Sequence, residues 1–299
     1  MRWADLQIAV VGGDEREQEI ALQAAGTGAR VRAFGFPWPE GGIDGVELAA
    51  GAAAALRGAH YALFPIPGIA TDGTLFAPAA AEPIKPDAGL LAELHPGAHI
   101  LLGLADGALR AAARDAGVTL HEYETDRELM LLRAPAIAEG AIRIAIERTR
   151  VTLHASEVAV VGFGNIGSHL ARTLVGLGAD VHVAARNPVQ RADAYASGAR
   201  PAPLERLPEI APRLAAVFST VPAPVVGKGV LGRLRKGTLV MDLAAPPGGV
   251  DLTLARELGM EAVWARGLGR RAPVTVGRSQ WNGVRARLER IEATRSDDH

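Results

Sequence analysis

The sequence predicts an α/β protein with two doubly wound parallel-sheet domains joined by a long helix, and with a C-terminal helix that packs back onto a domain. Three observations predict this class. The 299 residues suffice for two domains of about 150 residues each. Short apolar runs alternate along the chain with segments of helical periodicity, as in βαβ units. In two places, at Gly12 and at Gly162, an apolar run leads into glycines and then into a helix.

Composition and charge exclude several classes of function. Hydrophobic residues make up 48% and charged residues 22%, which is typical of a folded globular protein. A net charge of −1 argues against nucleic acid or an anionic membrane as a partner, because both attract basic surfaces. Since there is no cysteine, disulfides, thiolate nucleophiles and cysteine-bound zinc are excluded. We see neither a signal peptide nor an apolar run near the ~18 residues of a membrane span, so we expect a cytoplasmic protein.

Residues 1–125 predict the first domain, which we assign to the substrate and to catalysis. A helix is expected over 15–25, after Gly12 and Gly13, and a turn over 26–28 ends it. The expected strands are 6–11, 31–36, 61–65, 99–104 and 118–121. Residues 83–94 are expected to be partly helical, and a further helix is expected over 105–116.

Two helical segments lie outside the predicted sheets. Residues 126–150 predict a connecting helix, interrupted or started at Pro135, whose apolar positions wrap much of its circumference. Residues 278–299 form the predicted C-terminal helix and tail. The helix, over 278–292, carries Trp281, Val284 and Leu288 on one face, so it should pack on another domain.

Residues 151–277 predict the second domain, with strands over 158–161, 181–185, 215–220, 238–243 and 261–265. The segment Gly162–Gly167 matches the G-x-G-x-x-G pattern between an apolar strand and an amphipathic helix, which is the context that the pattern requires. Gly162 permits the tight turn, Gly164 lets the backbone approach a pyrophosphate, and Gly167 allows close helix–strand packing. With Asn165 and Ile166, they begin a helix whose free N–H groups suit a phosphate. We predict a Rossmann-type dinucleotide site, with an ordinary glycine-rich turn as the alternative.

The residues after the second strand of this domain indicate which dinucleotide binds. NAD-binding domains usually carry an acid there that holds the ribose hydroxyls, but this chain reads Ala185-Arg186-Asn187. A carboxylate would repel a 2′-phosphate, whereas Arg186 can pair with it. We therefore predict NADP, with Arg186 and Asn187 as contacts. NAD is the alternative cofactor, and a solvated surface arginine is the alternative for Arg186.

Two further segments follow strands of the second domain at the edge where cofactor loops lie. One follows the strand that ends near Ser219, and the other continues as Pro246–Gly249, for which a plain turn is the alternative. The predicted cofactor contacts in these segments are Thr220, Val221, Pro222, Asp242, Leu243 and Ala244.

The first domain offers two loops for the substrate. At the first strand-to-helix turn an anion could bind with the help of Arg16, or Asp14 could simply cap the helix. Residues 65–74 form a loop of small residues whose hydroxyl and backbone N–H groups suit a carboxylate, although a plain surface loop is the alternative. We predict substrate contacts at Gly13, Asp14, Pro67, Gly68 and Thr71, with Arg16 as a catalytic residue that holds substrate carboxylates.

The remaining chemistry is sparse. Glu139 lies in an otherwise apolar stretch, where a buried carboxyl would have a raised pKa and could transfer protons, so we predict it as a catalytic residue. A helix-surface glutamate facing water is the alternative. The eight histidines are scattered along the chain, so we predict no metal, and no G-x-S-x-G elbow indicates a serine hydrolase.

Several short segments together resemble the dipicolinate synthase A subunit family. They are Ile8–Asp14, Ala138–Ile142, Thr152–Gly162, Val240–Asp251, Gly267–Gly269 and Ala272-Pro273, which follow the family's order over nearly the whole chain. One departure stands out. The family shows Ala-Pro-Lys-Thr-Ala-Gly near its end, whereas this chain has Val274 in place of the lysine.

The resemblance implies an enzyme of spore-forming bacteria that acts in the cytoplasm of the mother cell. It implies oxidation of dihydrodipicolinate to dipicolinate together with a flavoprotein-like B subunit, and an N-terminal domain akin to those of 2-hydroxyacid dehydrogenases and adenosylhomocysteinase. We expect a homodimer by analogy with such folds. Two alternatives stay open: another NAD(P)-dependent dehydrogenase of that type, and a non-catalytic nucleotide-binding subunit.

Overall fold

The computed structural model describes residues 2–124 and 126–297, and the chain forms two compact units. The first unit combines Met1–Leu132 with Ala272–His299, and the second is Arg133–Arg271. Residue 125, where we placed the end of the first domain, and residues 298–299 of the predicted tail lie outside the described residues. Among the described helices, none has both the length and the apolar character needed to cross a membrane.

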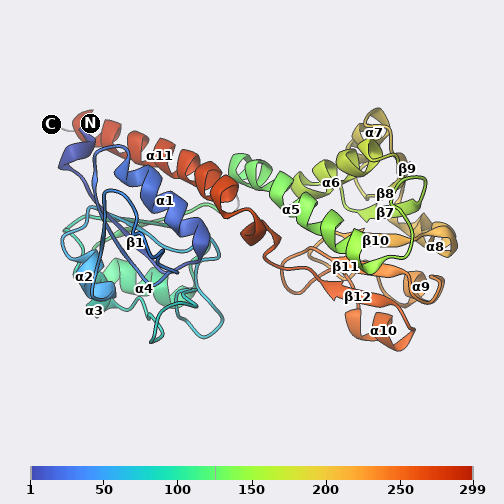
Figure 1. Ribbon diagram of the computed structural model, residues 1–299, viewed down its shortest axis with the longest axis horizontal. Helices are drawn as coiled ribbons and strands as arrows, with labels where there is room; N and C mark the ends of the chain where they lie inside the picture. The colour runs from blue at the N-terminus through green and yellow to red at the C-terminus, as the bar shows by residue number, and fades with distance from the viewer. Residues whose placement is uncertain (1, 125, 298–299) are drawn as a thin grey trace. The chain divides into compact units, whose positions relative to one another are not determined.

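The first domain, whose strand β1 is labelled in Figure 1, contains a six-stranded sheet in the order β3-β2-β1-β4-β5-β6. All of its strand pairs are parallel. The strands are β1 (Gln7–Val11), β2 (Arg30–Phe34), β3 (Val46–Leu48), β4 (Tyr61–Leu63), β5 (His99–Leu102) and β6 (Thr119–Glu122). The helices between them are α1 (Glu15–Ala25), α2 (Ala52–Leu56), α3 (Ala88–Leu91) and α4 (Gly107–Asp115).

The second domain has a parallel six-stranded sheet in the order β12-β11-β10-β7-β8-β9. Numbered within each domain, both sheets follow one order, 3-2-1-4-5-6. The strands are β7 (Glu157–Val161), β8 (Asp180–Ala184), β9 (Arg200–Ala202), β10 (Ala216–Ser219), β11 (Leu239–Asp242) and β12 (Glu261–Trp264). The helices are α6 (Asn165–Gly176), α7 (Pro188–Ala196), α8 (Leu207–Ile210), α9 (Lys228–Leu231) and α10 (Leu252–Glu257).

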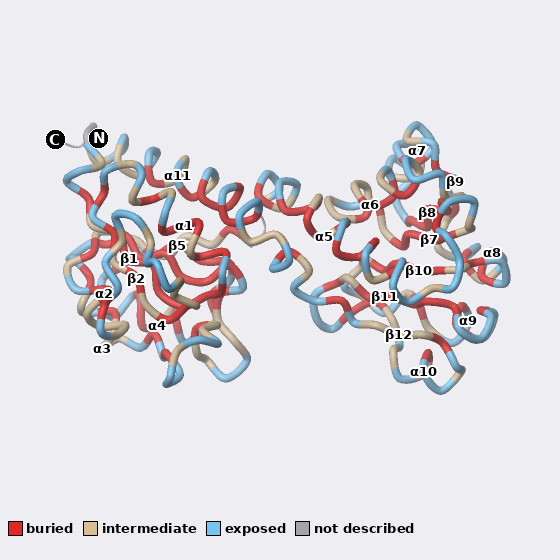
Figure 2. The backbone as a smooth tube through the Cα atoms, in the orientation of Figure 1, coloured by how far each residue is buried: buried red, intermediate tan, exposed pale blue. Residues whose placement is uncertain are grey.

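The central strands are apolar throughout because helices cover both faces of each sheet. In β7, Val158 and Val160 belong to one hydrophobic cluster, whereas Ala159 and Val161 belong to another. This alternation follows from the pleat, which sends successive side chains to opposite faces. Figure 2 shows the result as buried segments that run along the strands of both domains. The two doubly wound sheets confirm the predicted fold class.

Two long helices complete the chain. Helix α5 (Arg127–Arg148) contains Pro135 in its interior and runs from the first unit into the second. Helix α11 (Pro273–Asp297) packs against α1, as the apolar face of the predicted C-terminal helix required. It begins at Pro273 rather than at residue 278, since proline suits the first position of a helix. Residues 272–277, which we placed in the second domain, therefore belong to the first unit.

Polar contacts also attach α11 to the first domain. The guanidinium of Arg278 donates to Glu19 of α1 at 2.6 Å. Arg287 pairs with Asp126, and the hydroxyl of Tyr61 donates to Glu292. A Cβ on Gly277 would lie 2.6 Å from the carbonyl oxygen of Arg16, so the glycine allows α11 to approach α1 closely.

Candidate functional site

The strand order of each sheet identifies the edge where a ligand binds. The order changes direction between β1 and β4 in the first domain and between β7 and β10 in the second. Ligands of open α/β sheets bind beyond the carboxyl ends of the strands at this switch point, because the flanking loops diverge there. The loops at these two points contain Gly12–Asp14 and Gly162–Gly167.

The loop after β7 requires glycine at its first position. Gly162 has a φ of +92°, which other residues rarely adopt. A Cβ at this residue would lie 2.7 Å from Thr220 Oγ1 and 2.7 Å from Val221 Cγ2, so the loop packs directly against the segment after β10. The hydroxyl of Thr220 donates to the carbonyl oxygen of Val161 at 3.0 Å and holds the two segments together.

The next two glycines of the motif meet very different surroundings. A Cβ on Gly167 would lie 2.3 Å from the carbonyl oxygen of Gly162, so only glycine allows helix α6 to pack this closely. A Cβ on Gly164 would meet nothing within 4 Å. Gly164 is also the N-cap of α6, and it has no side chain that could accept from the N–H groups of Asn165 and Ile166 in the first turn.

These features fit a dinucleotide pyrophosphate. The start of a helix carries free N–H groups and about half a positive charge, which favours an anion. Open space over Gly164 leaves room for the phosphates beside those groups. The residues present thus provide the turn, the close packing and the uncapped helix that such a ligand needs.

The segment after β8 exposes a positive charge and no carboxylate. Arg186 and Asn187 are exposed, and Ala185 before them is buried. Asn187 caps α7, because its Oδ1 accepts from the backbone N–H of Val189 at 2.8 Å. Arg191 donates to the carbonyl oxygens of Ala185 at 2.8 Å and Arg186 at 2.6 Å, which fixes the backbone that carries the Arg186 side chain.

Asp242 organises the loop after β11 rather than facing a ligand. It is 1% exposed, and its carboxylate accepts from the backbone N–H groups of Ala244 at 3.0 Å, Gly249 at 2.7 Å and Val250 at 3.1 Å. The predicted direct cofactor contact at Asp242 therefore needs correction, because burial and these bonds occupy both oxygens. Leu243 and Ala244, also predicted contacts, are half-buried and buried, while Pro222 in the loop after β10 is exposed.

Asp14 and Arg16 form a closed ion pair at the first domain's switch point. Asp14 is 3% exposed and Arg16 6%. The guanidinium donates from Nε to Asp14 Oδ1 at 2.7 Å and from Nη2 to Oδ2 at 2.8 Å. Arg16 was predicted to hold substrate carboxylates. The structure contradicts this role, because the guanidinium is buried and already paired with the Asp14 carboxylate. The alternative we left open, helix capping by Asp14, is what the structure shows.

Glu17 is the functional candidate that sequence reasoning missed. It is the third residue of α1, it is 1% exposed, and its side chain completes a capping box with Asp14. Burial raises the pKa of the Glu17 carboxyl to about 7, while the nearby Arg16 guanidinium acts to lower it. An acidic residue three positions after an Asp N-cap was the available signal, since it is the spacing of a capping box.

The loop after β4 packs against its neighbours through glycines. Gly68 has a φ of +77°, and a Cβ there would lie 2.2 Å from the carbonyl oxygen of Leu104 after β5. A Cβ on Gly103 would lie 1.8 Å from the carbonyl oxygen of Ile66. Pro67 and Thr71, predicted with Gly68 as substrate contacts, are exposed on this loop.

Glu139 lacks the burial on which its predicted role depended. Its side chain is 63% exposed and pairs with Arg271, within the second domain. The burial premise was wrong, and the surface alternative describes the residue. Arg271 is engaged by Glu139, and Val274, which stands where the family has a lysine, is 50% exposed in the first turn of α11.

A histidine–carboxylate pair exists, but not at the glycine loop. His182 Nε2 lies 2.8 Å from Glu157 Oε2, and Arg213 donates to the same oxygen at 3.0 Å. Glu157 is the first residue of β7, so this cluster lies toward the amino ends of the strands, opposite Gly162. Among residues 2–124 and 126–297, no three potential metal ligands gather into a site.

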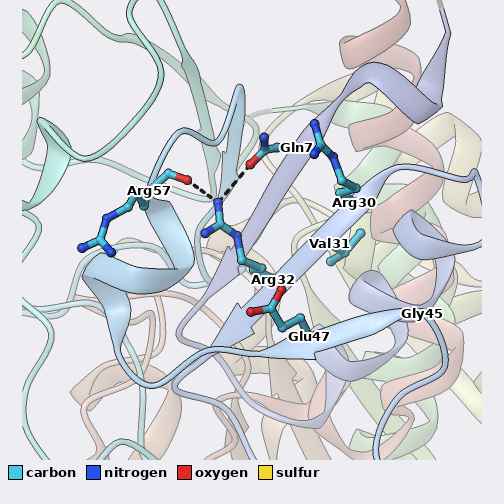
Figure 3. A pocket seen from close by; sticks show the side chains of 7 residues that line it. All are labelled: Gln7, Arg30, Val31, Arg32, Gly45, Glu47 and Arg57. Atoms are coloured by element: carbon cyan, nitrogen blue, oxygen red, sulfur yellow. Dashed lines mark hydrogen bonds between the residues drawn. The ribbon is translucent and has the colours of Figure 1, made fainter.

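Figure 3 shows a cavity of about 380 Å³ in the first domain. Arg32 lies at its centre and donates to Gln7 Oε1 at 3.0 Å and to the carbonyl oxygen of Arg57. Gln7 and Arg30 begin β1 and β2, so the cavity is at the amino ends of the strands. Because parallel sheets bind ligands at the opposite edge, we do not assign this cavity to the site.

Comparison with known proteins shows which proteins this chain resembles. Residues 7–124 match the family model for the N-terminal domain of the dipicolinate synthase A subunit. The dipicolinate synthase A subunit of Bacillus subtilis (strain 168) is 29% identical over 289 residues, which cover 96% of this chain and 97% of that one. Over nearly its whole length, the chain is similar to a dipicolinate synthase A subunit.

Two crystal structures of dipicolinate synthase A subunits have a similar fold over nearly the whole chain. The Bacillus halodurans protein has a TM-score of 0.87 at 27% identity and covers 96% of this chain and 99% of its own. The Bacillus subtilis protein has a TM-score of 0.86 at 28% identity and covers 97% of both. The expected resemblance is therefore confirmed.

A second family model covers the glycine loop. Residues 134–237 match the NAD-binding domain of D-isomer-specific 2-hydroxyacid dehydrogenases. The second domain is therefore of a type that binds a nicotinamide dinucleotide. This cofactor class makes oxidoreduction the class of reaction.

Proposed function

We propose that this chain is a dehydrogenase subunit that oxidises dihydrodipicolinate to dipicolinate with NADP. The observation that carries the proposal is the match to dipicolinate synthase A subunits over 96% of the chain, with an uncapped glycine loop in its second domain. In the proposed reaction dihydrodipicolinate gives up a hydride to NADP⁺ and releases a proton, and the products are dipicolinate and NADPH. Aromatisation of the ring favours this direction.

The bound nicotinamide would supply the hydride acceptor, and the chain's residues hold and orient the reactants. We assign the pyrophosphate to the first turn of α6, at Gly164, Asn165 and Ile166. The segment Thr220–Pro222 after β10 and the residues Leu243 and Ala244 after β11 flank the same switch point. Asp242 does not contact the cofactor itself, but its hydrogen bonds to backbone N–H groups hold the loop that begins with Leu243.

The proposed preference for NADP rests on Arg186. Its side chain is exposed, the backbone that carries it is anchored by Arg191, and the neighbouring Ala185 and Asn187 bring no negative charge. A guanidinium can pair with a 2′-phosphate through two parallel hydrogen bonds. Asn187 would contribute its free amide N–H₂, because its Oδ1 is used to cap α7.

For the substrate we propose the first domain's switch-point loops, at Gly13, Asp14, Pro67, Gly68 and Thr71. The Asp14–Arg16 pair is itself neutral, and Pro67 and Thr71 are exposed and can meet a dicarboxylate. We further propose that the partner is a flavoprotein-like B subunit, that the chain forms a homodimer, and that it works in the cytoplasm of the mother cell during spore formation. These last assignments follow the family resemblance alone.

The deciding experiment measures dipicolinate formation by the purified chain. Freshly generated dihydrodipicolinate is supplied with NADP⁺ or NAD⁺, each with and without the B-type partner. We expect product above the spontaneous rate, and faster with NADP⁺ than with NAD⁺. Product from the chain alone makes it the dehydrogenase, and product only with the partner makes it an obligate component of a complex. If neither mixture exceeds the spontaneous rate, the substrate assignment is wrong, and Val274 becomes the first residue to restore to lysine.

A further inference from the structure

One buried carboxyl connects the two loops at the first domain's switch point. Glu17 Oε2 accepts from the backbone N–H of Asp14 at 2.7 Å, and its Oε1 accepts from the backbone N–H of Ile66 at 3.1 Å. Asp14 belongs to the loop after β1, and Ile66 belongs to the loop after β4. Each oxygen of a single carboxylate therefore holds one of the two loops.

The surrounding backbone is shaped to admit this side chain. Gly13 has a φ of +111°, and a Cβ at this position would lie 2.2 Å from Glu17 Cδ and 2.4 Å from Oε2. Gly12 is comparably restricted, since a Cβ there would lie 2.9 Å from Pro65 Cγ in the second loop. Both glycines are thus needed because the loops close over Glu17 and against each other.

Protonation would change what Glu17 can hold. As a carboxylate it offers one acceptor oxygen to each loop, but once protonated it presents a hydroxyl donor on one of those oxygens. The protonated oxygen is then a weaker acceptor for its N–H donor, so one of the two loops loses its hydrogen bond to Glu17. Burial places the pKa of this carboxyl at about 7, so the exchange between the two states falls in the physiological range.

The polar and charged groups near Glu17 come from four parts of the first domain. Helix α1 itself contributes Asp14 and Arg16, which pair with each other. Tyr123, directly after β6, lies close enough to interact with the Arg16 guanidinium. Helix α11, which packs against α1, carries Arg278, whose guanidinium is paired with Glu19 at 2.6 Å. The loop after β4 contributes the backbone N–H of Ile66.

We propose that Glu17 is a positioning residue of the substrate site: its carboxylate holds the Gly12–Asp14 and Pro65–Gly68 loops in the arrangement that binds substrate, and its protonation uncouples them. This inference rests on the proposed function for its consequence in catalysis, but the coupling of the loops is a property of the first domain alone. The two parts can therefore be tested separately.

The coupling is tested without any substrate. In ¹H–¹⁵N spectra of the full chain recorded from pH 5.5 to 8.5, the amide signals of Asp14 and Ile66 should titrate together with a midpoint near 7. In Glu17→Gln, which keeps the size of the side chain, both titrations should vanish. Glu19→Gln is the matched control, since Glu19 is 7% exposed on the same helix and binds Arg278 instead of the loops. Independent titration of the two amides, or titration that survives in Glu17→Gln, overturns the coupling.

The catalytic consequence is tested by the pH dependence of KM for dihydrodipicolinate. If only the ionised form binds substrate, KM should rise about tenfold from pH 8 to pH 6, because the competent fraction falls by that factor, while kcat changes little. Glu17→Gln should hold KM at the high value throughout. Glu17→Asp keeps the charge but is too short to reach both loops, so its KM should also stay high.

If Glu17 acted only by repelling the substrate's charge, the pH dependence of KM would be reversed. A dicarboxylate would then bind better once Glu17 is neutral, so KM would be lower at pH 6 than at pH 8. Glu17→Asp would behave like the parent protein. Either result overturns the positioning role. If no turnover is detected in any variant while the amides of Asp14 and Ile66 still titrate together, the proposed function fails and the loop coupling stands.

Discussion

The two domains use the same turn for opposite purposes. Both sheets follow one strand order, and in both a glycine in the left-handed region follows the first strand, with φ of +77° at Gly12 and +92° at Gly162. The helix after Gly162 starts at Gly164 with no side chain over its N–H groups. The helix after Gly12 starts at Asp14, and Asp14 and Glu17 complete a capping box.

The difference shows what makes a helix start available to a ligand. A helix N-terminus attracts negative charge whatever its source. In the first domain the chain's own carboxylates supply that charge at the start of α1. In the second domain the place is left to an incoming anion. A fold shared by both domains therefore says little about ligands until the residue at the helix cap is known.

The largest expected effect comes from giving the second loop the cap of the first. Gly164 has φ −86° and ψ −160°, so aspartate fits its backbone without strain. Gly164→Asp should cap α6 and lower NADP affinity about 100-fold, or ~2.7 kcal/mol, because the new carboxylate takes the place of the phosphate. Isothermal titration with NADP⁺ measures this effect.

The control places the same charge at a helix start in the first domain. Gly107 begins α4, and a Cβ there would meet nothing within 4 Å. Gly107→Asp should leave NADP affinity unchanged. Equal affinity in Gly164→Asp and the parent chain would show that the uncapped helix does not hold the cofactor.

A smaller effect sharpens the comparison at the next loop of the second domain. Arg186→Ala removes an exposed guanidinium that we assign to the 2′-phosphate, so NADP affinity should fall about 10- to 100-fold, as expected for a lost charge-assisted hydrogen bond of about 1.5–3 kcal/mol. NAD affinity should change little. Arg200→Ala is the control, since Arg200 begins β9 and pairs with Asp180 at 2.8 Å. An equal loss of both cofactors in Arg186→Ala would refute the assignment to the 2′-phosphate.

The smallest effect concerns the pH dependence of stability, which should have opposite signs in the two domains. Burial acts to raise the pKa of Glu157, but hydrogen bonds from Arg213 and His182 outweigh it and leave the pKa below its usual value. A lowered pKa stabilises the fold above pH ~4.5, and that contribution is lost as the pH falls below it. Because Glu157 lies near the surface, the contribution should stay below about 1 kcal/mol.

Glu17 has the reverse behaviour. Its pKa is raised to about 7, so the folded state binds a proton more tightly than the unfolded chain, and stability falls as the pH rises from ~4.5 to 7. Urea unfolding at pH 4, 6 and 8 measures both effects. Relative to the parent chain, Glu157→Gln should lose stability at pH 6 and 8 but not at pH 4, whereas Glu17→Gln should lose less at pH 8 than at pH 4. The same pH profile for both variants would contradict this contrast.

The sequence predicted the fold well wherever burial leaves a pattern. The ten predicted strands all exist, because strands covered on both faces read as continuous apolar runs. The two strands that were not predicted, β3 and β9, have three residues each and lie at an edge of their sheets. Glu47 and Arg200 in these strands are exposed, so there is no apolar run to detect. The early start of α11 at Pro273 was missed because Val274 and Thr275 in its first turn are exposed and leave no apolar pattern.

The site was predictable only where local chemistry determines it. Gly162 and Gly167 follow from spacing, because Gly162 must adopt a positive φ in the turn and Gly167 packs against the carbonyl oxygen of Gly162. The roles of Arg16 and Glu139 depended on which partner each side chain meets, and composition does not give that. Asp242 and Glu17 illustrate the same limit. Both are buried carboxylates whose partners are backbone N–H groups, and those partners are brought to them only by the folded loops.

The return of the chain to its first domain has a consequence for biosynthesis. Helix α11 belongs to the first compact unit, whereas the second unit is one uninterrupted segment, Arg133–Arg271. As the ribosome emits the chain, the cofactor domain is complete before the domain that was begun first, since the latter still lacks the helix that covers α1. The first domain therefore stays unfinished until α11 has been synthesised. A product truncated before α11 would carry a complete cofactor domain and a first domain whose uncovered apolar surface chaperones and proteases can recognise.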